Sequence, residues 1–270
     1  MIITSIQTPR PLGNSPAGLQ RRLEFAHNLL TIAVDHRLLW LPLATETTGS
    51  TTLDRNARAI TYDASIASRF TAQGSGYAIT FDGVDDEGAT PATANLSFGD
   101  GPTDPPFSGY GGVNVTNTAA IRVILSKLDL TTGSELREWE FDIDSDDTLR
   151  FILFDESADL QLLRGSASAI TQGSFRFFAA TYDGSREGTG IKLYEDAAAL
   201  SLAADGSDGS YVAMENLSTL VRLGFRQGTA AGASFFSGSM LCVGLVAKEL
   251  TVDELWAMKA LGNSFFDLSL

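Results

Sequence analysis

The chain has 270 residues, of which 44% are hydrophobic, and this composition predicts a globular fold and excludes a disordered one. Its 33 Asp and Glu residues exceed its 19 Lys and Arg residues, and the formal net charge of −14 disfavours binding to the phosphate backbone of nucleic acids. The single cysteine, Cys242, excludes an intrachain disulfide, and two histidines near the N-terminus leave the rest of the chain without a Ser-His-Asp triad or a multi-histidine metal site.

The first 37 residues are predicted to form an arm ahead of the main domain. Residues 1–15 contain several Pro and Gly residues, which predict an extended segment. From 16 to 36, apolar residues recur at spacings of three and four along two stripes, which favours a short helix buried between two surfaces; a strand over 29–34 is the alternative. The expected partner-binding residues on this helix are Leu19, Leu23, Phe25 and Leu30.

The start of the chain shows no basic segment followed by an apolar core, so no secretory signal is predicted. No apolar run of about 18 residues occurs, so no insertion into a membrane is expected.

From residue 38 onward, short apolar or alternating runs are separated by clusters of Gly, Asp and Ser. Many short strands joined by such turns predict an all-β sandwich or barrel. The runs predicted to be strands are 38–43, 77–81, 121–126, 138–143, 149–154, 175–182, 191–194, 221–225 and 240–246. Cys242 falls in the last of these runs, where a buried thiol is expected.

One helix is predicted near the C-terminus. Thr251 and Glu254 have the spacing of a capping box, and apolar residues at 255, 258 and 261 would line one face. Gly262 is the expected end of this helix.

Taken in chain order, several segments resemble the laminin-G-like (concanavalin A-like) jelly-roll family. These segments are LWLPL at 39–43 with the loop 47–58, FDGVDD at 81–86, NLSFGDG at 95–101, ILSK at 124–127, AATYDGS at 179–185 followed by IKLY at 191–194, and FSGSM at 236–240. The resemblance implies a two-sheet antiparallel jelly-roll sandwich with a short C-terminal helix. We therefore predict an arm over residues 1–37, serving attachment or oligomerisation, and a jelly-roll domain over 38–270.

Asp82, Asp85 and Asp86 form an acidic turn that is the candidate calcium site. Calcium takes about six to eight oxygen ligands, and such a turn supplies some of them. The resemblance implies calcium near this turn, but where the family often places Asp-Glu on its last core strand this chain has Met-Leu-Cys at 240–242. The alternative is that these carboxylates cap turn amides and that no cofactor is bound.

The segment Glu140-Phe-Asp142-Ile-Asp144 resembles the catalytic strand of retaining β-glucanases, with Glu140 as nucleophile and Asp144 as acid/base. Hydrolysis with retention of the anomeric configuration needs the two carboxyl groups about 5–5.5 Å apart. Positions i and i+4 of a regular strand, such as 140 and 144, are roughly 13 Å apart. The acidic stretch 142–147 is more simply a hairpin turn, and four scattered arginines, Arg176, Arg186, Arg222 and Arg226, are expected in ion pairs. The sequence therefore favours a protein that is not an enzyme.

Two non-enzymatic functions follow from these features. The main hypothesis is a virion structural or accessory protein of a phage, made in the host cytoplasm, that attaches through its arm to other virion proteins or to copies of itself. The alternative is a glycan-binding, lectin-like module that recognises cell-surface glycans. The glucanase ranks third.

Overall fold

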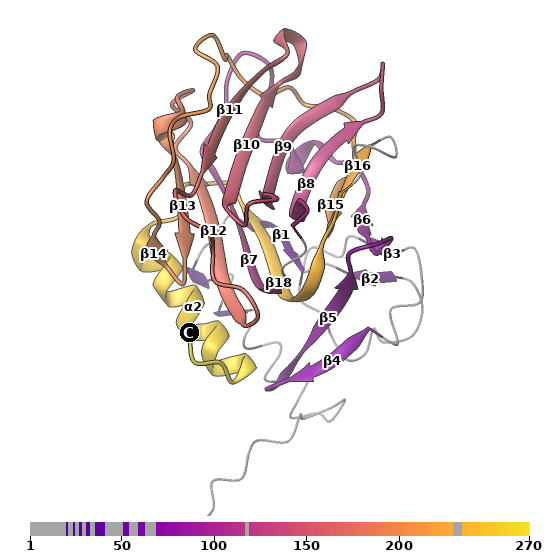
Figure 1. Cartoon of the computed structure of the whole chain (residues 1–270), viewed down its shortest axis with the longest axis vertical. Coiled ribbons are helices and arrows are strands. Elements are labelled where there is room, and N and C mark those ends of the chain that lie inside the picture. Colours follow the sequence, from indigo (N-terminus) through magenta and orange to yellow (C-terminus); the bar gives the residue numbers. More distant parts are fainter. Residues whose placement is uncertain are drawn as a thin grey trace, which may run out of the picture.

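The computed structural model describes residues 36–40, 51–53, 59–62, 69–116, 119–228 and 234–270, together with six positions between 20 and 32. Two antiparallel sheets face each other and form a β-sandwich (Figure 1). The predicted all-β, two-sheet fold is thus confirmed.

The first sheet has eight strands among the described residues, in the order β14-β13-β12-β7-β18-β5-β4, with β1 paired to β18. Its strands are β1 (His36–Trp40), β4 (Phe70–Gln73), β5 (Gly76–Asp82), β7 (Phe107–Val115), β12 (Phe175–Tyr182), β13 (Ile191–Glu195), β14 (Ala198–Ala199) and β18 (Ser237–Val246).

The second sheet has ten strands among the described residues, in the order β11-β10-β9-β8-β15-β6-β3-β2, with the β16-β17 hairpin added beside β8. Its strands are β2 (Thr51–Leu53), β3 (Ala59–Tyr62), β6 (Gly88–Thr90), β8 (Arg122–Leu130), β9 (Leu136–Ile143), β10 (Leu149–Asp155), β11 (Leu160–Gly165), β15 (Val221–Leu223), β16 (Phe225–Gly228) and β17 (Ser234–Phe235). Short 3-10 turns occur at η3 (Ala94–Leu96), η4 (Glu156–Ala158) and η5 (Gly188–Gly190).

The main core lies between the two sheets and is rich in aromatic rings. Phe98 and Phe107 stack with ring centroids 4.2 Å apart, and Trp139 and Phe151 pack against Phe107. These rings are almost fully buried, and burying each one stabilises the fold by roughly 1.5–3 kcal/mol.

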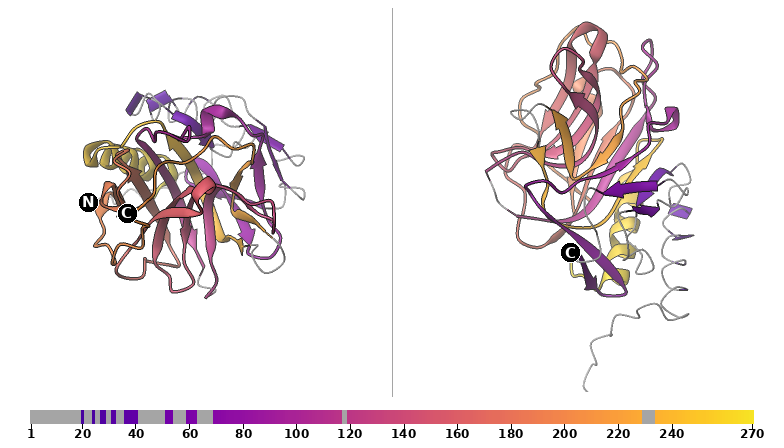
Figure 2. Two further views of the ribbon diagram at one scale, coloured as in Figure 1. Left: turned by 90° about the horizontal axis from the view of Figure 1, so that it is seen from above. Right: turned by 90° about the vertical axis from the view of Figure 1, so that its right-hand side faces the viewer.

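Helix α2 (Val252–Phe266) lies against the outer side of the eight-stranded sheet (Figures 1 and 2). A second apolar cluster lies between the helix and this sheet. Leu255, Met258 and Phe266 of the helix pack in one cluster with Tyr110 and Leu241 of the sheet. This helix therefore covers the eight-stranded sheet and not the ten-stranded sheet.

The structure corrects the predicted end of α2. Gly262 lies inside the helix, which continues to Phe266 and is capped by Asp267 in a left-handed conformation with φ of 56°. A Cβ atom at Gly262 would meet open space, so this glycine fills no special conformational role. The buried rings of Phe265 and Phe266 explain the extra turn, because they anchor it to the second cluster.

The sequence did not predict β7 or β11. Strand β7 lies between β12 and β18 and carries three glycines. These glycines lower its strand signal, yet a Cβ atom at Gly111 would come within 3.0 Å of Ile124 across the core. The predicted strand 221–225 is divided into β15 and β16 by Gly224, whose φ of +73° favours glycine.

The N-terminal predictions are tested only in part. The six described positions from Gln20 to Ile32 are helical, and Ile32 packs against the second apolar cluster. The predicted partner-binding residues Leu19, Leu23, Phe25 and Leu30 lie outside the described residues, so their role stays a prediction. None of the described helices is long and apolar enough to cross a membrane.

Candidate functional site

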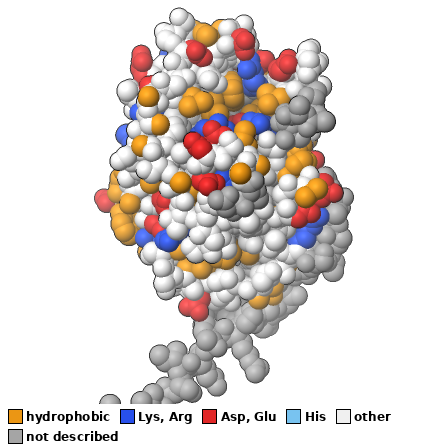
Figure 3. Space-filling model, viewed as in Figure 1, with side chains coloured by type: hydrophobic (Ala, Val, Ile, Leu, Met, Phe, Trp, Pro, Cys, Tyr) orange, Lys and Arg blue, Asp and Glu red, His pale blue; other side chains and the backbone are white. Residues whose placement is uncertain are grey.

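The outer face of the ten-stranded sheet carries a small apolar patch, which we call the open-face patch. It consists of the buried side chains of Leu128 on β8 and of Ile152 and Phe154 on β10, and the half-buried Leu130 and Leu163 pack against it and form its accessible edge. Alternation along β10 explains this arrangement, because Phe151 and Leu153 point into the main core and their neighbours point outward. Figure 3 shows hydrophobic side chains gathered on this face, with basic and acidic side chains next to them.

One end of the patch is bounded by Arg137. Its guanidinium carbon lies 5.3 Å from the centroid of the Phe154 ring, which is a cation–π distance. Glu156 and Asp159 accept hydrogen bonds from the same guanidinium at 2.5 and 2.6 Å. These two carboxylates fix Arg137 over the edge of the patch.

The second group on this face is a charged row made by Glu140 and Asp142 on β9, Arg150 on β10 and Arg226 on β16. Asp142 is fully buried, and both of its oxygens accept hydrogen bonds from Arg150, at 2.9 and 2.6 Å. The remaining terminal nitrogen of Arg150 donates to Asp144 at 2.6 Å. Burial opposes the charge of Arg150, but these hydrogen bonds and the charge of Asp142 outweigh it and raise the pKa of Arg150.

Glu140 lies at the centre of the charged row and is 1% exposed. Its Oε2 is 3.4 Å from Nη1 of Arg226, whereas its Oε1 has no hydrogen-bond partner among the described residues. Burial and the neighbouring charge of Asp142 raise the pKa of Glu140 to about 8. Burial therefore favours the neutral form of this carboxyl group.

The predicted glucanase motif has a different geometry from the one that its resemblance implies. Glu140 and Asp142 do lie on the outer face, as strand alternation predicts. However, β9 ends at Ile143, and Asp144 is hydrogen-bonded to Arg150. The rest of the acidic stretch forms the turn between β9 and β10, where Asp146 accepts hydrogen bonds from Thr148.

The predicted calcium ligands do come together. One oxygen from each of Asp82, Asp85 and Asp86 lies within 4.8 Å of the others. Asp82 also accepts the backbone N–H of Val84 at 2.8 Å, and Asp86 accepts that of Asp82 at 2.8 Å. Asp86 is in addition ion-paired with Arg69. These contacts fit carboxylates that cap a turn, and calcium binding stays a prediction.

Three of the four arginines singled out in the sequence are in ion pairs. Arg176 contacts Asp196 at 2.8 Å and Arg222 contacts Glu87 at 2.8 Å. Arg226 contacts Glu140 of the charged row at 3.4 Å. The prediction of ion pairs is confirmed for these residues.

Asp104 is a further buried carboxylate that the sequence did not single out. It accepts hydrogen bonds from Tyr211 Oη at 2.6 Å and from the Met214 backbone at 2.8 Å. Burial outweighs these bonds and raises the pKa of Asp104 to about 6. The adjacent cleft, near η5, has a volume of about 460 Å³ and is lined by Glu187, Asp205 and other polar residues. Asp104 and Asp205 both have polar partners, and we assign no ligand to this cleft.

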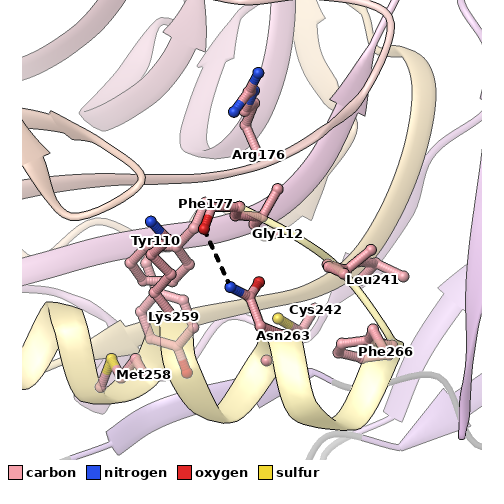
Figure 4. A pocket seen from close by; sticks show the side chains of 13 residues that line it. Tyr110, Gly112, Arg176, Phe177, Leu241, Cys242, Met258, Lys259, Asn263 and Phe266 are labelled. Atoms are coloured by element: carbon pink, nitrogen blue, oxygen red, sulfur yellow. Dashed lines mark hydrogen bonds between the residues drawn. The ribbon is translucent and has the colours of Figure 1, made fainter. Parts of the chain in front are cut away.

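An apolar cavity lies between α2 and the eight-stranded sheet (Figure 4). Its volume is about 30 Å³, which is room for roughly one water molecule. Asn263 points into it and donates to the Leu270 carbonyl at 3.4 Å. Cys242 also lines the cavity, is 7% exposed, and has its pKa raised to about 12 by burial, so the expected buried thiol is confirmed. The cavity is too small for a sugar.

Sequence reasoning therefore found the carboxylates of the open face but missed its apolar patch and Arg150. The missed signal is the alternation of Arg150, Ile152 and Phe154 along a strand whose other residues fill the core. Such a pattern indicates a surface site only when it is known which strands lie beside this one and which of their side chains share its outer face.

Comparison with known proteins bears on the fold alone. No family model and no curated protein matches the chain. Among solved structures, Trypanosoma rangeli sialidase matches with a TM-score of 0.57 and 12% identity over 93% of this chain, and the match spans 38% of the sialidase chain. The CBM40 of Ruminococcus gnavus IT-sialidase matches with a TM-score of 0.50 and 14% identity, over 67% of this chain and 97% of the CBM40. These likenesses confirm a β-sandwich; they show neither a laminin-G-like family nor a phage family.

Proposed function

We propose that this protein is a carbohydrate-binding β-sandwich module and that the open-face patch with its charged row holds the glycan. One observation carries the proposal: a small apolar cluster, with Leu130 and Leu163 as its half-buried edge, lies beside arginines that carboxylates hold, on a sheet face that α2 does not cover. Sugars present both apolar C–H faces and hydroxyl groups, and sites that bind small polar molecules combine an apolar lining with a few fixed polar groups.

The arginines of this face are suited to such a role because buried carboxylates fix their positions. Asp142 and Asp144 together take three hydrogen bonds from Arg150, and Arg226 contacts Glu140 and Ser234. A side chain that is already ordered loses little conformational entropy when a ligand binds. The CBM40 likeness supports the same reading, since the neighbour is named as a carbohydrate-binding module.

We propose in addition that the module is not an enzyme. Arg150 is bound to both Asp142 and Asp144, so neither carboxylate is poised as a free acid or base. Attachment to a virion through the N-terminal arm remains a hypothesis from the sequence; the glycan-binding role has the better structural support.

Glycan-array binding by the full chain tests the proposal, followed by calorimetry with lactose and α2,3-sialyllactose as a neutral and an acidic probe. Two variants change the site: Leu163→Glu places a charge on the half-buried edge of the patch, and Arg226→Gln removes a guanidinium. We expect each to weaken binding about tenfold or more, a loss of at least about 1.4 kcal/mol.

The matched control is Trp256→Ala on α2. This tryptophan is 50% exposed and belongs to the other side of the sandwich, so its loss should leave affinity unchanged. The proposal is wrong if the wild type binds no glycan on a broad array, or if Trp256→Ala abolishes binding while both open-face variants keep it.

A further inference from the structure

Two carboxylates hold the guanidinium group of Arg150 at one end of the open-face patch. Asp142 accepts two of its hydrogen bonds, at 2.9 and 2.6 Å, and Asp144 accepts a third at 2.6 Å. Asp142 is fully buried, whereas the side chain of Asp144 is 27% exposed. A ligand at this end of the face therefore meets a carboxylate beside the arginine.

The other end of the patch has the same arrangement. Arg137 donates to Glu156 at 2.5 Å and to Asp159 at 2.6 Å. The side chain of Asp159 is 82% exposed and that of Arg137 is 19% exposed. The negative charge at this end is therefore more accessible than the positive charge that it compensates.

The formal charges of this face sum to a negative value among the described residues. Two of its three arginines are bound by the four carboxylates described above. The third, Arg226, is in an ion pair with Glu140. Three positive charges therefore face four negative ones when Glu140 is protonated and five when it is ionised, so the excess is negative in either state.

Neighbouring cations do not offset this excess. Arg222 on β15 is paired with Glu87, and Lys127 on β8 is paired with Glu138. Each of these cations has a carboxylate of its own, so neither adds net positive charge to the face.

Neutral and acidic sugars make different demands on such a face. A carboxylated or sulfated sugar brought to Arg150 or Arg137 would also approach Asp144 or Asp159, and like charges repel strongly where water is partly excluded. The hydroxyl groups of a neutral sugar can donate to carboxylate oxygens and accept from N–H groups. Arg150 uses three of the five N–H donors of a guanidinium group on its two carboxylates, so donors remain for hydroxyl oxygens.

We propose that the open face selects neutral glycans and rejects glycans that carry a carboxylate or sulfate group. This proposal rests on the proposed function and names the ligand class of the same site.

Calorimetry of the full chain with lactose and α2,3-sialyllactose, which differ by one acidic sugar, tests the proposal at about 10 mM and about 150 mM NaCl. We expect the wild type to bind lactose about tenfold or more tightly than sialyllactose at the lower salt concentration. Because salt screens repulsion, the affinity for sialyllactose should rise at the higher one. An affinity for sialyllactose that matches or exceeds that for lactose, or that falls as salt is added, overturns the proposal.

Two variants separate charge from the size of the added sugar. Asp144→Asn and Asp159→Asn each remove one negative charge with little change of shape, and asparagine tolerates the left-handed backbone at position 159, where φ is 54°. The measured quantity is the ratio of the two affinities, which a general loss of binding does not alter. We expect this ratio to shift toward sialyllactose about threefold or more in at least one variant.

Glu249→Gln is the matched control, because it removes the same charge from the chain but pairs with Lys192 of β13 on the other sheet. It should keep the wild-type ratio. Unchanged ratios in both Asp variants, or an equal shift in the control, would mean that sugar size or the charge of the whole chain decides, and would overturn the proposal.

A glycan array separates this proposal from the proposed function. If lactose is not bound, the best-bound neutral glycan and its sialylated counterpart take the place of the calorimetry pair. An array whose bound glycans are mainly sialylated or sulfated overturns the preference for neutral glycans and leaves glycan binding intact. An array without any bound glycan refutes the proposed function, and the preference with it.

Discussion

Lys127 and Glu138 form an ion pair in which neither side chain is exposed. The Lys127 ammonium also donates to Ser97 Oγ at 3.0 Å and to the Leu217 carbonyl at 2.7 Å. Burial raises the pKa of Glu138 and lowers that of Lys127, while their mutual attraction acts in the opposite direction on both. The pair connects β8 and β9 to the segment before β15. It is not part of the charged row, and its role is to stabilise the fold.

Lys127→Met should therefore be strongly destabilising. The substitution keeps the length of the side chain but leaves the Glu138 carboxyl group buried without its cation. Breaking a buried pair in this way costs about 3–5 kcal/mol in the free energy of unfolding, measured by urea denaturation.

Lys192→Met is the control, because Lys192 pairs with Glu249 at the surface and is 51% exposed. Its cost should stay within about 1 kcal/mol. Similar losses in the two variants would mean that water reaches the Lys127 site.

At the scale of the element, the sequence predicted the start of α2, which a capping box determines, better than its end, which packs on the sheet. Thr251 and Glu254 form the expected capping box, with Thr251 N–H donating to Glu254 Oε2 at 2.9 Å and Glu254 N–H donating to Thr251 Oγ1 at 3.3 Å. The start of the helix was thus predictable from local chemistry. Its end was not, because the last turn depends on a sheet surface formed by strands far away in the sequence.

Thr251→Ala tests the contribution of the cap. We expect the free energy of unfolding to fall by about 1 kcal/mol, since the first-turn amide of Glu254 loses its acceptor. Chemical denaturation followed by circular dichroism measures this change.

Ser264→Ala, at an exposed position inside the same helix, serves as the comparison. It should change stability by less than about 0.5 kcal/mol. If Thr251→Ala changes the free energy of unfolding as little as Ser264→Ala does, packing on the sheet alone determines the stability of the helix.

Strands and the candidate site likewise divide into features that local sequence predicts and features that depend on residues far away in the chain. A strand with a nearly continuous apolar run, such as β12, was predicted with its observed bounds, whereas the glycine-rich β7 was missed although it is central in its sheet. Glu140 was identified from its motif, but its partner Arg226 comes from a hairpin 86 residues away. No local pattern encodes that pairing, because strand order brings the two residues together.

At the scale of the whole molecule, the dominant electrostatic feature is the formal net charge of −14. The described Arg and Lys side chains in ion pairs compensate nearby carboxylates, so the excess negative charge is carried by the remaining acidic residues. Like charges on a compact molecule repel one another, and this repulsion is weaker in the expanded unfolded chain. The folded state should therefore be destabilised at neutral pH when little salt is present.

We expect the melting temperature at pH 7 to rise when NaCl increases from about 10 mM to about 150 mM, because the Debye length shortens from about 30 Å to about 8 Å. The rise should vanish close to the isoelectric point of 4.5, where the net charge is near zero. Differential scanning calorimetry at the two pH values and two salt concentrations measures the effect. A melting temperature that falls with salt at pH 7 would mean that attractive pairs such as Arg150–Asp144 and Arg137–Asp159 outweigh the overall repulsion.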